Sequence, residues 1–345
     1  MILSEKFKTK NVENIKLSLI LKNKEHTKPS PIFLSRTLKI PCMIMGIIIF
    51  STLMSGCISS KPDSSSSIQS TLRIGVMSDL GAVPFVIAQQ QDYFEKRGLQ
   101  VEIQVFKSAI DRDTALQTGN LDGAMVDMLT LLFYNDAGFD VKMTSQTYGN
   151  YKMITSPSLS IDSFLNLNTV SVGLSSNTVI EFATQKIAEA KDFDAKLSMV
   201  AIPQMPVRLE MLRANELNGA TLPDPLASAA VLDGGSLIGS TEEYGLFPGI
   251  FVMTQTAIEQ NSDGIKSLNE AYDEAVDYIN QKQIEEYFDF LVEKLGFPPV
   301  LKGKFEMPTF IKTSPPDQKT FNEVSSWMQK KGLLKKQFSY ESLLG

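Results

Sequence analysis

The residues best suited to chemistry are aspartates that directly follow short apolar runs. Asp127 comes after GAMV (123–126), and Asp224 follows GATLP (219–223). An ionised carboxylate only accepts hydrogen bonds, so at these places it would suit an amine or amino-heterocycle donor. The structural alternative is that Asp127 caps the helix beginning at Met128 and that Asp224 shapes a Pro-Asp-Pro turn. We favour ligand binding for Asp127 more than for Asp224.

Two polar loops supply the other candidates. Residues 78–81 (SDLG) follow the first apolar run, and residues 175–178 (SSNT) hold the equivalent place later in the chain. Each loop precedes an expected helix, where free backbone N–H groups can hold a ligand oxygen, although the same residues are typical helix caps. Tyr148 and Tyr151 lie at an expected crossover and either stack on a flat ligand or simply pack. The candidate ligand-binding residues are therefore Ser78, Asp79, Gly81, Asp127, Tyr148, Ser175, Ser176, Asn177, Thr178 and Asp224.

The charge of these loops indicates the kind of ligand. They contain Asp79, Asp127 and Asp224 but neither lysine nor arginine. A sulfonate or nitrate would have to depend on helix N-termini against three carboxylates. We therefore expect a neutral or cationic organic ligand.

The charge of the whole chain excludes one class of partner. The 345 residues have a formal net charge of −6, but residues 1–56 hold nine Lys/Arg and only three Glu. The rest has 24 basic and 36 acidic side chains, a net charge of −12. Because such a body repels phosphate backbones, we expect no nucleic-acid partner. At 43% hydrophobic residues, the chain can build the cores of two domains.

The sequence offers no catalytic constellation. The sole histidine, His26, and the two cysteines, Cys42 and Cys57, all lie in the N-terminal region. The body therefore cannot form a Ser-His-Asp triad, a Cys-His pair or a histidine zinc site. It also has no Walker A loop and no G-x-G-x-x-G after a strand. We expect a protein that is not an enzyme and needs neither cofactor nor metal.

The N-terminal region resembles a lipoprotein export signal. A charge-free apolar run extends over residues 42–54 and is followed by Ser55-Gly56-Cys57. The run is short for a membrane span but suits a signal peptide, and residues 53–57 resemble a lipobox, with Met54 where the pattern usually has leucine. This resemblance implies a cleaved leader (residues 1–56) and a lipid on Cys57. The alternative is an uncleaved membrane anchor, and both place the body outside the cytoplasmic membrane.

Two neighbouring segments complete the N-terminal region. Residues 1–35 exceed what a signal needs, which suggests a start codon assigned too early. Residues 57–70 are serine-rich and predict a flexible tether without a fold of its own.

From Leu72 onward the chain reads as two successive α/β units. Strands are expected at 72–76, 101–106 and 123–126 in the first unit, and at 169–174, 197–202 and 219–222 in the second. Five identical pairs share an offset of 96: Arg112 and Arg208, Leu116 and Leu212, Leu121 and Leu217, Gly123 and Gly219, Ala124 and Ala220. The pattern predicts two lobes of one architecture, each a mainly parallel sheet flanked by helices.

The expected division of the body follows from these units. We place lobe 1 at 71–148, lobe 2 at 149–255 with hinge strands at 151–156 and 249–255, and C-terminal helices that return to lobe 1 at 256–345. In lobe 1 we expect one helix from Pro84 to Arg97, stopped by Gly98, and a second helix capped by Asp111.

Four segments carry a family resemblance: LRIGVMSDLGAVPFVIAQQQDYFEKRGLQVEI (72–103), ALQTGNLDGAMVD (115–127), IPQMPVRLEMLRANELNGATLPDPLA (202–227) and WMQKKGLL (327–334). Together they resemble the solute-binding proteins of ABC importers, in particular the branch that binds alkanesulfonates, taurine and pyrimidine precursors of thiamine. The resemblance covers nearly everything from residue 71 onward.

The resemblance implies a type II periplasmic-binding-protein fold, with a two-strand hinge and a small organic ligand held between two closing lobes. It also implies an ABC permease with its ATPase as partner, a monomeric state and a lipid anchor on the outer face of the cell membrane. One alternative is a ligand-sensing lipoprotein that presents its closed form to a receptor. Another is a thiamine-pyrimidine synthase of the same fold, but those enzymes use a histidine and a cysteine-rich motif that this body lacks.

Overall fold

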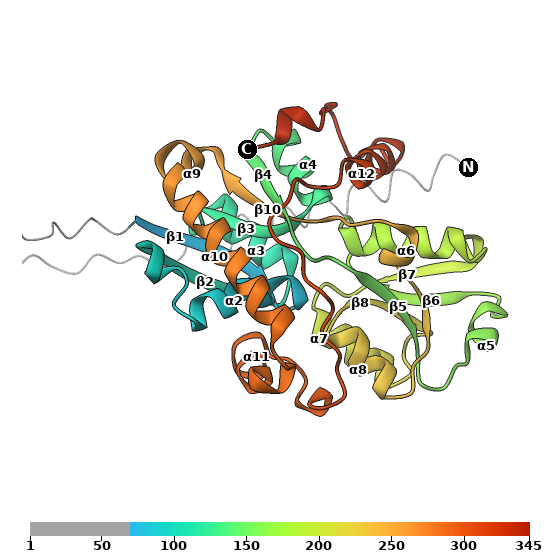
Figure 1. Ribbon diagram of the computed structural model, residues 1–345. Coiled ribbons are helices and arrows are strands. Elements are labelled where there is room, and N and C mark those ends of the chain that lie inside the picture. Colours follow the sequence, from blue (N-terminus) through green and yellow to red (C-terminus); the bar gives the residue numbers. More distant parts are fainter. Residues whose placement is uncertain (1–69) are drawn as a thin grey trace, which may run out of the picture. The chain divides into compact units, whose positions relative to one another are not determined.

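The computed structural model describes residues 70–345 (Figure 1). The expected leader, the lipobox with Cys57 and almost all of the expected tether lie outside the described residues. None of the helices in the described part of the chain combines the length and hydropathy needed to cross a membrane.

The first sheet has the strand order β2-β1-β3-β10-β4. Its strands are β1 (Ser70–Met77), β2 (Leu99–Phe106), β3 (Gly123–Asp127), β4 (Val141–Gln146) and β10 (Gly249–Thr254). Only β10 runs against the others. The helices that connect these strands are α2 (Val83–Gln90), α3 (Ala109–Gln117) and α4 (Met128–Asp136).

The second sheet repeats this topology in the order β7-β6-β8-β5-β9. Its strands are β5 (Tyr151–Thr155), β6 (Val170–Leu174), β7 (Leu197–Ala201), β8 (Gly219–Pro223) and β9 (Leu237–Ser240), of which β5 is reversed. Its helices are α5 (Ile161–Leu165), α6 (Val179–Ala190), α7 (Met205–Arg213) and α8 (Leu226–Leu232). The predicted α/β class with two mainly parallel sheets is confirmed.

The offset of 96 residues has a packing cause. Gly75 of β1 is paired with Ala124, and Gly173 of β6 is paired with Ala220. A Cβ added at Gly75 would lie 2.6 Å from Leu121 Cδ1, and one added at Gly173 would lie 2.7 Å from Leu217 Cδ1. Leu121 and Leu217 therefore pack directly on a bare backbone, so the two sheets need a small and a large residue at these equivalent places.

The two expected hinge strands each belong to one sheet, which corrects the predicted hinge. β5 lies in the second sheet, but β10 lies in the first, so residues 249–255 are not an end of lobe 2. The reason is that β10 is buried along nearly its whole length and finds ladder partners on both sides, β3 and β4. The chain crosses between the sheets at residues 147–150 and 241–248, where Gly149 and Gly249 come into direct contact.

Two local predictions for the first lobe are also wrong. The helix expected at 84–97 ends at Gln90, and a separate 3-10 helix, Glu95–Arg97, follows before Gly98, which has a φ of 67°. The next helix begins at Ala109 with Ser108 as its N-cap residue, so Asp111 is not the cap. Asp111 instead lies in the first turn, where its charge favours the helix dipole.

The C-terminal part contacts both lobes. It contains α9 (Gln255–Gln260), α10 (Ser262–Gln281), α11 (Phe288–Leu295) and α12 (Gln318–Lys330). Helix α10 packs on α2, which is buried along most of its length, and α12 packs on α4. Helix α12 also reaches α6, since Trp327 Nε1 donates to Gln185 Oε1 at 2.8 Å and Lys331 pairs with Glu181.

Residues 302–317 have no regular structure and form a segment that we call the strap. Figure 1 shows the strap, in dark orange to red, running along the boundary between the two sheets. Ser314 O of the strap accepts from Gln146 N at 2.9 Å, at the end of β4. The strap is thereby fixed against the first crossover.

Candidate functional site

Several of the sequence candidates meet between the carboxyl ends of the two sheets. A cavity of about 40 Å³, which we call the cleft, is lined from the first lobe by Asp79, Arg112 and Asp127, and from the second by Tyr151, Ser175, Thr178 and Arg208, with apolar residues completing the wall. Ligands of open α/β sheets bind at this edge, where helix N-termini converge. The cleft is thus the candidate site.

The lobes are closed on each other beside the cleft. Leu80 N donates to Asp224 O at 3.1 Å, and Gln204 Nε2 reaches Asp111 Oδ2 at 3.5 Å, each across the lobe boundary. A neck of only about 10 Å³, lined partly by Gly81, lies next to the Leu80 contact. Since a space of this size holds at most about one water, an organic ligand enters only when the lobes separate.

Asp79 is a cap whose carboxyl is also unusually placed. Its Oδ1 accepts from Gly81 N at 2.9 Å and so begins the 3-10 helix Leu80–Ala82. Burial raises the pKa of Asp79 to about 7, against the opposing effects of the Gly81 hydrogen bond and Arg112. A group of this kind changes its charge near neutral pH.

Asp127 combines the two roles that the sequence left open. Its Oδ1 accepts from Thr130 N at 2.9 Å and caps α4, while the residue also lines the cleft. Burial raises the pKa of Asp127, and the nearby Arg112 opposes this rise. The cap therefore does not remove Asp127 from the site.

Asp224 is occupied by structural contacts. Its Oδ1 accepts from Ser228 N at 3.0 Å and from Ser228 Oγ at 2.7 Å, and its Oδ2 is paired with Lys152 Nζ. The residue lines the neck but not the cleft. These contacts favour the structural alternative for Asp224.

The serine-rich loops reach the cleft only in part. Ser175 and Thr178 line it, and Thr178 Oγ1 caps α6 by accepting from Ile180 N at 3.2 Å. Ser176 and Asn177 are exposed and do not line it. Ser78 donates to Leu295 O and lines a different cavity, so it is also not brought to the cleft.

The site contains basic side chains in addition to the loops considered from the sequence. The cleft is lined by Arg112 of α3 and Arg208 of α7, which are the pair related by the offset of 96. Lys152 of β5 is paired with Asp224, which lines the neck. These basic side chains come from helices and a strand, whereas the aspartate and serine candidates lie at strand ends or in the loops that follow strands. Their repeated spacing was the signal that could have found the two arginines.

The two arginines donate to equivalent backbone carbonyls in the two lobes but differ in charge balance. Arg112 Nη1 donates to Met125 O at 2.9 Å, and Arg208 Nη1 donates to the equivalent Thr221 O at 2.6 Å. Arg112 is also paired with Asp113 at 2.7 Å. Burial works to lower the pKa of Arg112, but Asp113 raises it above the ordinary value.

Arg208 is a buried cation without such compensation. It is 0% exposed, and its other donors go to Ile202 O at 3.2 Å and to Ser175 Oγ at 2.8 Å. No carboxylate within residues 70–345 forms an ion pair with it. Burial accordingly lowers the pKa of Arg208 to about 10, at which it is still charged at neutral pH.

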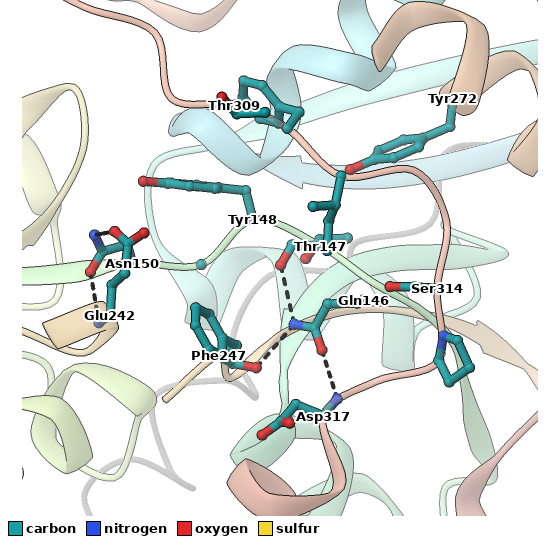
Figure 2. A pocket seen from close by; sticks show the side chains of 14 residues that line it. Gln146, Thr147, Tyr148, Asn150, Glu242, Phe247, Tyr272, Thr309, Ser314 and Asp317 are labelled. Carbon is teal, nitrogen blue, oxygen red and sulfur yellow. Dashed lines mark hydrogen bonds between the residues drawn. The ribbon is translucent and has the colours of Figure 1, made fainter. Parts of the chain in front are cut away.

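The two candidate tyrosines lie on the first crossover and face different spaces. Tyr151 lines the cleft, whereas Tyr148 lines the neck and a larger cavity of about 370 Å³, which we call the hinge pocket (Figure 2). The hinge pocket and the cleft share no lining residue. Within the described chain no cluster of three His, Cys, Asp or Glu side chains is arranged to hold a metal ion.

Comparison with known proteins agrees with this architecture. Residues 66–156 match the model of the NMT1-like family, and no curated protein matches the chain in sequence. Among solved structures, a ligand-binding component of an ABC-type import system from Staphylococcus aureus, with zinc bound, has a TM-score of 0.69 at 13% identity, over 80% of this chain and 97% of that one.

Two further structures have the same fold. The alkanesulfonate-binding protein SsuA from Xanthomonas axonopodis pv. citri, bound to MOPS, has a TM-score of 0.68 at 16% identity over 80% of this chain and 98% of its own. The periplasmic nitrate-binding protein NrtA from Synechocystis PCC 6803 has a TM-score of 0.63 at 14% identity, over 80% and 85%. The predicted resemblance is thereby confirmed: residues 66–156 match the NMT1-like family, and the described chain has the fold of the periplasmic binding proteins of ABC import systems.

Proposed function

We propose that this chain is the extracytoplasmic solute-binding component of an ABC importer and that its cleft captures a small organic anion. The observation that carries the proposal is Arg208 at the lobe boundary, a fully buried guanidinium that has no carboxylate partner among residues 70–345. A buried charge is costly unless it is paired. An anionic ligand group would supply the missing partner when the lobes close.

The surroundings of Arg208 suit a carboxylate or a sulfonate. Ser175 Oγ lies 2.8 Å from the guanidinium, and α6 begins at Val179 directly after the same loop. A hydroxyl, a planar fork of donors and a helix N-terminus are groups that bind such oxyanions. This reverses the ligand charge expected from the loops alone.

The two cleft carboxyls are compatible with an anion because burial raises the pKa of each. Asp79, with a pKa of about 7, can take up a proton when an anion binds nearby. Anion capture should therefore be coupled to proton uptake and strengthen as the pH falls through 7.

Delivery of the ligand would follow from lobe motion. Opening must break the Leu80–Asp224 hydrogen bond, and a ligand that contacts both lobes shifts the population back to the closed form. In this proposal, a lipid on Cys57 tethers the monomeric protein to the outer face of the cell membrane, and a permease with its ATPase receives the closed form. The names of the matched structures support import and anion binding, as a sulfonate-binding and a nitrate-binding protein are among them.

The proposal is tested by a ligand screen on the full-length protein. Thermal shift is measured with ethanesulfonate, propionate, nitrate and a neutral aminopyrimidine, since any ligand specific for the native state raises its stability. We expect stabilisation by at least one of the anions and none by the aminopyrimidine. Stabilisation by the aminopyrimidine alone would refute the anion-binding cleft.

A further inference from the structure

The hinge pocket has the dimensions and the wall of a small-molecule site that is separate from the cleft. Its volume of about 370 Å³ lies in the range of known ligand pockets. Four aromatic side chains line it, namely Tyr148, Phe247, Tyr272 and Phe310. Phe247 is 43% exposed and Ile311 is 55% exposed, so large apolar side chains also stand at its rim. Such a wall suits a flat aromatic molecule.

A polar group in the wall is available to a ligand. Figure 2 shows the Tyr272 hydroxyl directed towards the middle of the pocket. A phenolic hydroxyl both donates and accepts hydrogen bonds, so it can contact a polar group of an occupant.

The charge of the wall selects the sign of that occupant. Of the 14 lining residues, Glu242 and Asp317 are acidic and none is Lys, Arg or His. Asp317 Oδ1 caps α12, and Glu242 Oε2 accepts from Asn150 Nδ2 at 2.6 Å, so among the described residues each carboxylate keeps a second oxygen without a hydrogen bond. These two acidic side chains, of which Glu242 is the more exposed, and the aromatic faces favour an amine or another aromatic cation.

The position of the pocket connects it to lobe motion. Its wall combines the first crossover, the second crossover and the strap. Gln146 joins all three, because its Nε2 donates to Phe247 O at 3.0 Å and its Oε1 accepts from Asp317 N at 2.8 Å (Figure 2). Both crossovers must bend when the lobes separate, so this wall keeps its shape only in the closed arrangement.

We propose that the hinge pocket is an effector site for a flat aromatic amine, and that an occupant stabilises the closed form. The occupant differs in charge and in place from the anion of the cleft. Since closure is favoured from either site, occupancy of one raises the affinity of the other.

The binding test uses tryptamine as probe and indole-3-propionate as its anionic counterpart of similar size. Equilibrium dialysis is performed on the full-length protein in neutral-lipid nanodiscs, with empty nanodiscs subtracted. We expect saturable binding of tryptamine and at least about tenfold weaker binding of indole-3-propionate. Absence of saturable tryptamine binding, or equal binding of the two probes, would overturn the proposal.

Two exposed wall residues and two controls locate the site. Glu242→Gln and Phe247→Ala should each weaken tryptamine binding by about fivefold or more. Glu243→Gln, which changes an exposed neighbour that is paired with Lys191 outside the wall, should not. Arg213→Gln, which changes a surface arginine paired with Glu210 and Asp233, should also leave tryptamine binding unchanged. Equal losses in the Glu242 and Glu243 variants, or a loss with Arg213→Gln, would place the probe elsewhere and refute the hinge site.

Closure is measured without any cleft ligand, so its outcome is independent of the proposed transport function. The Leu80 amide bonds to Asp224 across the lobe boundary, and its hydrogen exchange therefore reports opening. Saturating tryptamine should slow exchange at Leu80 several-fold in the wild type and not in Phe247→Ala. Bound tryptamine with unchanged Leu80 exchange would refute the coupling.

Discussion

Replacement of Arg208 by methionine tests the anion-binding cleft most directly. The change keeps a long unbranched side chain but removes the guanidinium that contacts Ser175 Oγ, Thr221 O and Ile202 O. Removing one partner from a buried, hydrogen-bonded charge pair costs about 2 to 5 kcal/mol. We therefore expect the dissociation constant of the best anion to rise by about 30-fold to several thousand-fold.

The stability of the unliganded protein should respond much less to this change. Loss of the guanidinium leaves buried carbonyl oxygens without their donor, which costs about 1 to 3 kcal/mol each. The same change removes a buried, unpaired cation, whose burial itself costs several kcal/mol. Because these effects oppose each other, we expect the free energy of unfolding of Arg208→Met to stay within about 2 kcal/mol of the wild type.

The assay is isothermal titration calorimetry with the anion that gives the largest thermal shift, together with urea unfolding in its absence. Arg213→Gln is the matched control, since Arg213 lies on the same helix but pairs with Glu210 and Asp233 at the surface. Arg208→Lys keeps the charge without the planar fork and should lose affinity to an intermediate degree. Unchanged affinity in Arg208→Met, or an equal loss in Arg213→Gln, would show that Arg208 does not hold the ligand.

Three further predictions concern other groups. Asp79 has a folded pKa of about 7, above its unfolded value, so the native state holds the proton more tightly and the free energy of unfolding falls as the pH rises from about 4 to 7. In urea unfolding, Asp79→Asn should flatten this pH dependence and raise the free energy of unfolding at pH 8 by at most about 4 kcal/mol. A pH dependence that persists in the variant would contradict this prediction. Asp224→Ala should lower the free energy of unfolding by about 3 to 5 kcal/mol, because the change leaves Lys152 and Ser228 without their partner. Calorimetry should show little loss of anion affinity in this variant. A large loss of affinity with normal stability would instead make Asp224 a ligand-binding residue. Cys57→Ala should abolish fatty-acid labelling and release the protein from the membrane fraction, and equal labelling of the variant would refute lipidation.

The sequence predicted the fold well because the fold depends on local patterns. Apolar runs of strand length, helix caps such as Thr178 and the glycine and leucine pairs at one offset are properties of short segments. Their repetition was enough to predict two sheets of the same plan. Strand membership was harder, since β10 could be assigned to the first sheet only from partners that lie more than 100 residues earlier in the chain.

The candidate site was predicted less completely because it depends on long-range contacts. The loops after the strands were correct places to look, and Asp79, Asp127, Ser175 and Thr178 do meet in the cleft. Their charge environment was not readable there, because Arg112 and Arg208 enter from the faces of helices. In sequence these arginines look like ordinary solvated helix residues.

The sequence by itself determined the α/β architecture, the repeat and the absence of histidine and cysteine from the described body. Only the tertiary structure decided that Asp224 is neutralised by Lys152, that Arg112 is neutralised by Asp113 and that Arg208 remains a buried charge without a carboxylate among the described residues. The physical reason is that fold follows from patterns within a few residues, whereas the electrostatics of a site follow from burial and pairing between segments far apart in the chain.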